Sequence, residues 1–230
     1  MNKYKFKRFA FYFLPPLDSP LSCFGAGWLG WSIDRGEMMP FLDPVSCNHS
    51  EIIAKAQKYG FHGTLKPPFR LHQDTCFEDL VDAANTLMAN VSHFNLPQLM
   101  LNDLDGFFVL RPKIDCPDVI NLAHILVTKL DHFRALSSEE ELQRRRSNGL
   151  TERQDKLLIE WGYPYVLEEF RFHLTLTKKL DQFSANQVYN ILQNHLTQEM
   201  LTPIQVKDIG LVGEAEDGRF HLIKRIPFGH

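Results

Sequence analysis

One five-residue pattern occurs twice in this chain, and each time it opens the same order of predicted elements. The pattern F-H-x-T-L stands at Phe61–Leu65 and again at Phe172–Leu176. Each copy is followed by a helix with a capping signal, a proline, and a hairpin with an Asp-Gly turn, at residues 105–106 and 217–218. The order strand, helix, strand, strand is common and can arise by accident, but the shared opening favours a duplicated unit.

The repeat sets the predicted organisation of the chain. The first copy spans about residues 51–112, the second spans about residues 165–230, and a helical insert of about residues 115–164 separates them. The helices of the two copies are expected to begin at the signals Thr75-x-x-Glu78 and Ser184-x-x-Gln187. The insert contains three predicted helices: Pro117–Phe133, one that Ser138 caps, and one that Thr151 caps. We treat residues 1–230 as a single domain with two lobes.

Strand geometry gives the repeated pattern a chemical meaning. Successive side chains of a strand point to opposite faces, so the histidine and threonine of each copy share one face. The phenylalanine and leucine point the other way and can bury in a core. If the two copies pack about a pseudo-two-fold axis, their polar faces line one cleft. The predicted polar face comprises His62, Thr64, Lys66, Arg171, His173 and Thr175.

Two histidines across a cleft suit in-line displacement at phosphorus. One imidazole takes a proton from the attacking water while the other donates a proton to the leaving oxygen, and both steps are possible near neutral pH. We assign His173 as the base and His62 as the acid, although the sequence leaves the reverse assignment open. Thr64 and Thr175, with Lys66 or Arg171, can hold the non-bridging oxygens. A lone histidine in a strand is usually structural, and here the duplication favours function.

Other candidate site residues lie outside the two copies of the pattern. A strand is predicted at Lys5–Leu14, where the phenylalanines alternate with a second face that includes Tyr12, so we expect Tyr12 to border the cleft. The insert carries the run Arg144–Arg146, which is either a solvated helix face or a basic lid that contributes Arg145 to a second phosphate or carboxylate. Tyr165 leads back to the second strand and is expected at the cleft border.

Composition excludes several classes of function. Lys and Arg number 25 against 28 Asp and Glu, a net charge of −3, which argues against a nucleic-acid coat or a polybasic membrane binder. Four widely spaced cysteines indicate neither a disulfide framework nor a zinc knuckle. The remaining histidines lack metal-ligand spacing, and the sequence contains no G-x-x-x-x-G-K-[ST] phosphate loop. The sequence predicts a cytoplasmic protein with no metal, no cofactor, no membrane partner and no extended nucleic-acid partner.

The paired motifs resemble the 2H phosphoesterase superfamily. Longer stretches resemble its branch of phosphonate-metabolism proteins that are encoded with carbon–phosphorus lyase systems. Gly63 departs from that branch, which more often has a small residue such as alanine there, and we expect no effect on the chemistry. The stretches that carry the branch resemblance are Phe24-Gly25, Trp28-Leu29-Gly30, Tyr59–Leu71, Glu141–Arg146, Gly149–Gln154, Trp161–Val166 and Glu169–Thr177.

The resemblance implies both a fold and an activity. The fold is bilobal α+β, with two antiparallel sheets framing a central cleft and helices outside. The activity is metal-independent hydrolysis of a phosphodiester, often a cyclic one, in which the superfamily's two histidines and two Thr/Ser residues correspond to His62, His173, Thr64 and Thr175. The branch implies a sugar phosphate from phosphonate breakdown, such as a ribose cyclic phosphate.

Two other functions remain open from the sequence. An enzyme that opens RNA 2′,3′-cyclic ends or joins RNA would use the same cleft, but it would need a broad basic surface and stacking aromatic residues. A binding module would hold a small phosphorylated ligand without turning it over. The first expectation is therefore a phosphoric diester hydrolase that acts on a small phosphorylated substrate.

Overall fold

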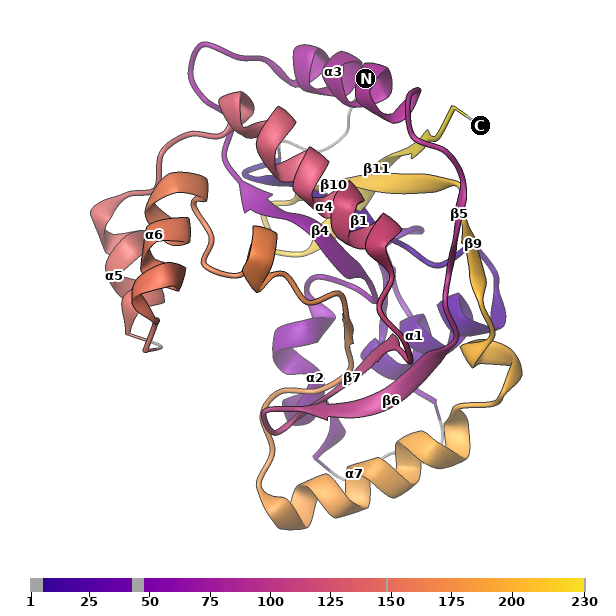
Figure 1. The fold of residues 1–230 in the computed structure, drawn as a ribbon. Coiled ribbons are helices and arrows are strands. Elements are labelled where there is room, and N and C mark those ends of the chain that lie inside the picture. Colours follow the sequence, from indigo (N-terminus) through magenta and orange to yellow (C-terminus); the bar gives the residue numbers. More distant parts are fainter. Residues whose placement is uncertain (1–5, 43–47, 148, 230) are drawn as a thin grey trace.

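The protein is built on one long antiparallel sheet (Figure 1). The structure, a computed structural model, describes residues 6–42, 48–147 and 149–229, so Lys5 and His230 lie outside it. Short 3-10 turns lie at Asp131–Phe133, Leu167–Glu169 and Glu199–Leu201. The main elements are β1 (Phe9–Phe13), α1 (Pro20–Leu29), β2 (Trp31–Ser32), β3 (Glu37–Met38), α2 (His49–Gln57), β4 (Gly63–Phe69), α3 (Phe77–Met88), β5 (Phe94–Leu96), β6 (Leu99–Leu104), β7 (Phe107–Pro112), α4 (Pro117–Lys129), α5 (Glu139–Arg146), α6 (Glu152–Trp161), β8 (Leu174–Thr175), α7 (Gln182–His195), β9 (Ile204–Val206), β10 (Asp208–Glu214) and β11 (Phe220–Pro227).

The two strands that carry the repeated pattern are neighbours in the main sheet. Its strand order is β11-β10-β1-β4-β8-β7-β6, and β4 pairs antiparallel with β8 at Gly63 and Leu174. The α+β class with antiparallel strands is confirmed. The two expected sheets, however, are two parts of one hydrogen-bonded sheet that meet at this residue pair.

The hairpin of each copy lies in the part of the sheet that contains the motif strand of the other copy. The hairpin β6–β7 of the first copy pairs with β8 of the second, and the hairpin β10–β11 of the second joins β4 through β1. The short strands β5 and β9, which precede the two hairpins, also pair with each other. The two copies are therefore interlocked in space rather than side by side as consecutive units.

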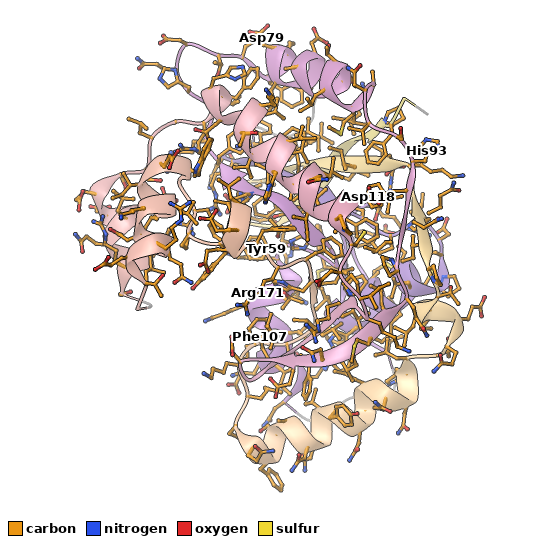
Figure 2. All side chains as sticks on the ribbon, viewed as in Figure 1. Tyr59, Asp79, His93, Phe107, Asp118 and Arg171 are labelled. Carbon is orange, nitrogen blue, oxygen red and sulfur yellow. The ribbon has the colours of Figure 1, made fainter. Side chains whose placement is uncertain are left out.

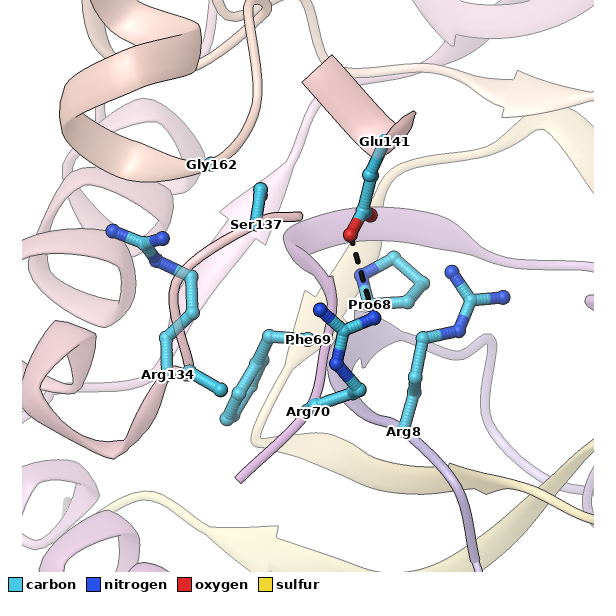
Figure 3. A pocket seen from close by; sticks show the side chains of 9 residues that line it. Arg8, Pro68, Phe69, Arg70, Arg134, Ser137, Glu141 and Gly162 are labelled. Atoms are coloured by element: carbon cyan, nitrogen blue, oxygen red, sulfur yellow. Dashed lines mark ion pairs between the residues drawn. The ribbon is translucent and has the colours of Figure 1, made fainter. Parts of the chain in front are cut away.

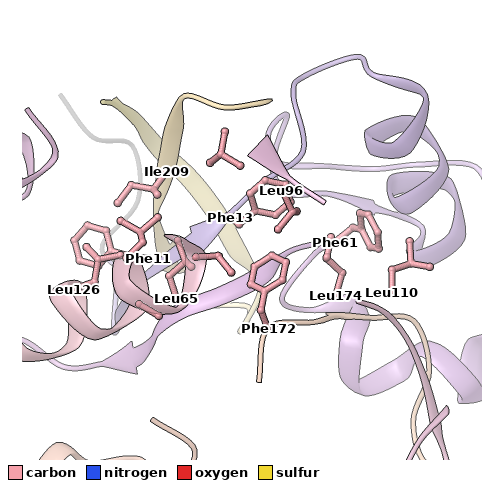
Figure 4. Packing of buried hydrophobic residues seen from close by; sticks show 14 of the residues in the cluster. Phe11, Phe13, Phe61, Leu65, Leu96, Leu110, Leu126, Phe172, Leu174 and Ile209 are labelled. Carbon is pink, nitrogen blue, oxygen red and sulfur yellow. The ribbon is translucent and has the colours of Figure 1, made fainter. Parts of the chain in front are cut away.

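The two faces of the sheet have different surroundings. Phe11 and Phe13 of β1 point into the large core, which also contains apolar side chains from α1, α3, α4 and α7. Figure 4 shows part of this core, with Phe11, Phe13 and Leu126 of α4. Both motif phenylalanines, Phe61 and Phe172, are buried in the same cluster. Tyr12 points to the opposite face, into a smaller cluster. The predicted alternation is confirmed for β1 and within the two motifs, up to Leu65 and Leu176, so the motif histidines lie on the face away from the large core.

Several predicted element boundaries were wrong, each for a local reason. α3 is capped by Cys76, whose Sγ accepts from the Asp79 amide, because the Thr75 hydroxyl donates to the His72 carbonyl instead. α7 begins earlier than predicted because Asp181 caps it. The Asp181 carboxylate accepts hydrogen bonds from the backbone amides of Phe183 and Ser184. The predicted helix Pro117–Phe133 ends at Lys129 and continues as a separate 3-10 turn.

The insert is split between the core and the periphery. Its first helix, α4, packs on β4 and buries Val119, Leu122 and Leu126 in the large core, so it is part of the main body. The other two helices, α5 and α6, extend to one side of the molecule (Figure 1). Their predicted caps are confirmed, including a complete capping box at Thr151. In the described residues, every helix is too short or too polar to cross a membrane.

Candidate active site

The pairing of β4 with β8 brings the two motifs together on one face of the sheet. Gly63 lies opposite Leu174, and this antiparallel register places His62 opposite Thr175 and Thr64 opposite His173. The two histidines are then diagonal neighbours, at about 7–8 Å between Cα atoms. Their charges are close enough for His173 to lower the pKa of His62. The four motif residues thus form one compact group.

Both imidazoles are held in the same way. Nδ1 of His62 lies 2.9 Å from the Gly60 carbonyl oxygen, and Nδ1 of His173 lies 2.7 Å from the Arg171 carbonyl oxygen. A carbonyl can only accept, so Nδ1 carries the proton in each ring and Nε2 is the free base of the neutral form. At His62 this Nε2 accepts from the Thr64 hydroxyl at 3.0 Å. The repeated contact to residue i−2 presents two Nε2 atoms on the same face.

Burial keeps both rings neutral at pH 7. It lowers the pKa of His62 to about 4, against the opposing effect of the Gly60 carbonyl, and it also lowers the pKa of His173. Tyr12 stacks on the His62 ring, with 3.8 Å between centroids, and is itself fully buried. Tyr12 therefore supports the ring from beneath, and burial raises the pKa of its hydroxyl well above the usual range.

Two glycines make room for the phenylalanines that precede the histidines. A Cβ on Gly25 would lie 2.1 Å from the Phe61 ring, and a Cβ on Gly63 would lie 2.5 Å from the Phe172 ring. Real Cβ atoms do not approach so closely, so each anchor depends on a glycine at its contact. The expectation that residue 63 has no influence on the site therefore overlooked the tight contact between Gly63 and Phe172.

Replacing Gly63 tests that contact. We expect Gly63→Ala to lower the free energy of unfolding by about 1–3 kcal/mol through overpacking, and to lower turnover because the displaced Phe172 adjoins His173. Urea unfolding and a rate assay measure the two effects. Gly218→Ala is the control: it has a left-handed φ and open space around it, so it should cost stability without lowering turnover. Equal turnover in both variants would refute the coupling.

The structure does not bring Lys66 to the histidines. Phe11 pairs with Lys66 and Tyr12 pairs with Thr64, so Leu65 is the extra residue of a β-bulge and the alternation of faces is reset. Lys66 is 2% exposed, its Nζ donates to the Val127 carbonyl at 3.1 Å, and it lies 3.5 Å from Asp131. Burial lowers its pKa to about 8. Sequence alternation alone could not reveal the bulge.

The interior position of Lys66 predicts a pH signature. Because its pKa is lower in the folded chain than in the unfolded chain, the free energy of unfolding should rise by about 2 kcal/mol between pH 8 and pH 10. Lys66→Met should remove this rise and leave KM for the substrate unchanged. Chemical denaturation at the two pH values, together with steady-state kinetics, tests this. A tenfold rise in KM would restore Lys66 to the phosphate contacts.

The other predicted site residues differ in their exposure to solvent. Arg171 is exposed, and Tyr165 is 45% exposed with its ring 5.7 Å from that of Tyr163. Arg145 lies over the Tyr163 ring at 4.9 Å, so the predicted lid arginine packs on an aromatic residue of the insert. Tyr163 is close enough to Tyr12 to influence its pKa, which places this part of the insert near the buried tyrosine.

Two aromatic residues at the site escaped the sequence analysis. The Tyr59 ring lies 6.2 Å from His62, and the Phe107 ring lies 6.1 Å from His173. Figure 2 shows both, with Arg171 between them, along the side of the molecule from which α5 and α6 extend. Tyr59 lies two residues before the first motif, and this position is the only sequence feature that could have indicated that it belongs to the site. Among the described residues, no three His, Cys, Asp or Glu side chains gather as metal ligands would.

Solved structures match nearly the whole chain at low sequence identity and low TM-score. One described as a phosphoesterase covers 98% of this chain at 14% identity with a TM-score of 0.44. E. coli LigT complexed with 3′-AMP also covers 98%, at 14% identity and a TM-score of 0.45.

Curated relatives and a family model match most of the chain. A ribose 1,5-bisphosphate phosphokinase PhnN from Janthinobacterium sp. (strain Marseille) is 34% identical over 229 residues, 96% of this chain and 51% of the relative. The protein of the same name from Laribacter hongkongensis (strain HLHK9) is 33% identical over 211 residues, 92% of this chain and 49% of the relative. The chain thus spans about half the length of these relatives. The family model described as a protein of unknown function, DUF1045, matches residues 64–221, and the chain belongs to this family.

Proposed function

We propose that this protein hydrolyses a cyclic phosphodiester in a small sugar phosphate or nucleotide, without a metal ion. The observation that carries the proposal is the twofold recurrence of one imidazole geometry. In each motif Nδ1 donates to the carbonyl of residue i−2, and Nε2 is left to exchange protons with a ligand. Structural histidines do not require such a matched pair, whereas in-line displacement at phosphorus requires an acid and a base together.

The structure favours exchanging the two roles assigned from the sequence. His62 resists protonation more than His173, since burial and its neighbour His173 lower its pKa to about 4. Its Nε2 also accepts a hydrogen bond from the Thr64 hydroxyl. Burial lowers the pKa of His173 as well, but less strongly, so His173 is the more readily protonated of the two rings. We therefore assign His62 as the base and His173 as the acid.

The proposed reaction is a single displacement. Nε2 of His62 takes a proton from water as the water oxygen bonds to phosphorus. The bond from phosphorus to the leaving oxygen breaks, and that oxygen receives the proton carried by Nε2 of His173. The Thr64 hydroxyl turns from Nε2 of His62 to the substrate, where Thr64 and Thr175 donate to the non-bridging oxygens, with Arg171 at the rim. Exchange with solvent returns both rings to their starting states.

The names of the relatives bear on the substrate and not on the reaction. They are phosphokinases about twice the length of this chain, and their name points to ribose carrying phosphate groups. The sequence of this chain contains no G-x-x-x-x-G-K-[ST] loop, the usual cradle for the phosphates of ATP. We therefore propose hydrolysis of a ribose cyclic phosphate, and a place in phosphonate breakdown, as the resemblance of the sequence implies.

Phosphorus NMR of a substrate panel tests the proposal. The panel contains nucleoside 2′,3′-cyclic phosphates and ribose cyclic phosphates, each with EDTA, and a parallel reaction contains ATP, Mg²⁺ and a ribose phosphate. The proposal expects ring opening to a monoester in the presence of EDTA. Binding of the panel without turnover would indicate a binding module, and transfer from ATP would indicate a kinase. RNA binding that weakens steeply with salt would favour an RNA substrate.

A further inference from the structure

A cavity rich in arginine lies beside the insert, at the ends of β1 and β4 away from His62. The cavity is small, about 20 Å³, and opens to solvent among residues that include Arg8, Arg70, Arg134 and Glu141. Figure 3 shows Glu141 reaching from α5 toward Arg70, with Arg8 and Arg134 on either side. The cavity therefore brings three guanidinium groups from separate segments to one carboxylate of the insert.

Two of the cavity arginines are fully committed to partners. Arg8 makes a two-pronged contact with Glu214, with distances of 2.5 and 3.0 Å, and Arg134 makes one with Asp131, with both distances 2.8 Å. These are the lengths expected of strong charge-assisted hydrogen bonds. Arg8 and Arg134 thus form a rigid positive wall.

The remaining arginines are held loosely. Glu141 lies 3.4 Å from Arg70 on one side and 3.4 Å from Arg145 on the other, well beyond the usual length for such pairs. Nε of Arg145 is buried and, within the described part of the chain, has no hydrogen-bond acceptor. One carboxylate therefore satisfies neither guanidinium, and a donor remains unused beside it.

The charges around the cavity do not balance. In the described residues, five cations share three carboxylates through the contacts above. These cations are Arg8, Lys66, Arg70, Arg134 and Arg145, and the carboxylates are Glu214, Asp131 and Glu141. An excess of two positive charges in a partly buried region disfavours the empty state and favours an anion with two negative charges.

We propose that a phosphate group binds here by displacing the Glu141 carboxylate, with two arginines as ligands: Arg70, which lines the cavity, and Arg145, which contacts Glu141 but does not line the cavity. A phosphate monoester carries nearly two negative charges at pH 7 and three terminal oxygens, which can meet two guanidinium groups at once. Glu141 is the internal anion that occupies the position in the free protein. Because Glu141 belongs to α5, its replacement loosens the contact between the insert and β4.

The phosphate group has two possible sources, free phosphate or a second, unreactive phosphate of the substrate. Arg8 and Tyr12 are four residues apart on one face of β1, about 13 Å along the strand, and Tyr12 stacks on His62. The cavity and the histidines thus share one face of the sheet. The second source rests on the proposed function, whereas the first does not.

Direct binding of inorganic phosphate tests the site itself. The experiment uses calorimetry at constant ionic strength in a His62→Asn, His173→Asn background, which removes the histidine site. We expect Arg70→Gln to weaken binding at least tenfold, Arg70→Lys to weaken it less, and Glu141→Gln to tighten it about tenfold. Arg144→Gln and Glu140→Gln, on the exposed side of α5, are matched controls. Equal affinities in all these proteins, the result of adventitious binding, would overturn the proposal.

A pair of substrates distinguishes the two sources. Nucleoside 2′,3′-cyclic phosphates with and without a 5′-phosphate are compared by kcat/KM. If the substrate supplies the group, Arg70→Gln lowers the preference for the phosphorylated compound about tenfold, and Arg144→Gln does not. If free phosphate supplies it, the preference is unchanged while the calorimetric result stands. Failure of both compounds to react would contradict the proposed function and leave the calorimetric test of the cavity in force.

Discussion

His62→Asn and His173→Asn should each lower kcat/KM on a cyclic phosphodiester by about 10²–10⁴, the usual contribution of a positioned acid or base. Asparagine keeps a hydrogen-bonding side chain without a group that titrates near pH 7. Both variants interrupt the same concerted displacement, so the double variant should be scarcely slower than the slower single variant. The two effects should therefore be strongly non-additive.

The chain supplies its own control for these variants. A third H-x-T sequence, His195-Leu196-Thr197, lies at the end of α7 and lacks the aromatic anchor. His195→Asn should leave kcat/KM unchanged. Circular dichroism and thermal melting check that the three variants fold alike. Full activity in either motif variant, or an equal loss in His195→Asn, would contradict the two-histidine mechanism.

The second large effect is a decline of kcat/KM at alkaline pH. In the reactive form His62 is neutral and His173 is protonated on Nε2 as well as on Nδ1. Burial holds the pKa of both rings below the ordinary value of 6.5. Above pH 6.5 the protonated fraction of His173 in the free enzyme falls tenfold per pH unit, so kcat/KM at pH 8.5 should be about 100-fold below its value at pH 6.5. Below about pH 4 it should fall again as His62 is protonated.

The substrate adds no ionisation in this range, because a phosphodiester keeps one negative charge across it. The pKa of the alkaline limb should match that of His173 followed by its imidazole resonances in NMR. In His62→Asn the acid limb should disappear from the residual activity. A kcat/KM that stays flat or rises between pH 6.5 and 8.5 would show that neither imidazole acts as the acid.

The strand periodicity predicted the site where the backbone is regular and failed where it is not. The alternation around His62 and His173 placed imidazoles and hydroxyls on one face, and the burial of Phe61 and Phe172 agrees with it. One residue beyond Thr64, a β-bulge turns Lys66 into the interior. A bulge depends on pairing with β1, a strand more than fifty residues away, so no local pattern announces it.

Long-range pairing also explains the part of the fold that the repeat did not reveal. The repeat predicted the elements of each half. It did not predict that β7 of the first hairpin would pair with β8, or that β1 would connect the second hairpin to β4. Similarly, Gly63 carries no special signal in the sequence, yet it allows Phe172 to lie against β4. The excess positive charge around Arg70 arises from four separate segments and becomes visible only when they are brought together.

The central claim is that both imidazoles act on the same phosphorus atom. Long-range ¹H–¹⁵N NMR of the wild-type protein, titrated with inorganic phosphate, reports on Nε2 of each histidine separately. The account predicts that the Nε2 signals of His62 and His173 shift together with a single dissociation constant, while both Nδ1 signals keep the signature of a donor to a carbonyl. Movement of only one Nε2 signal, or different dissociation constants for the two rings, would contradict it.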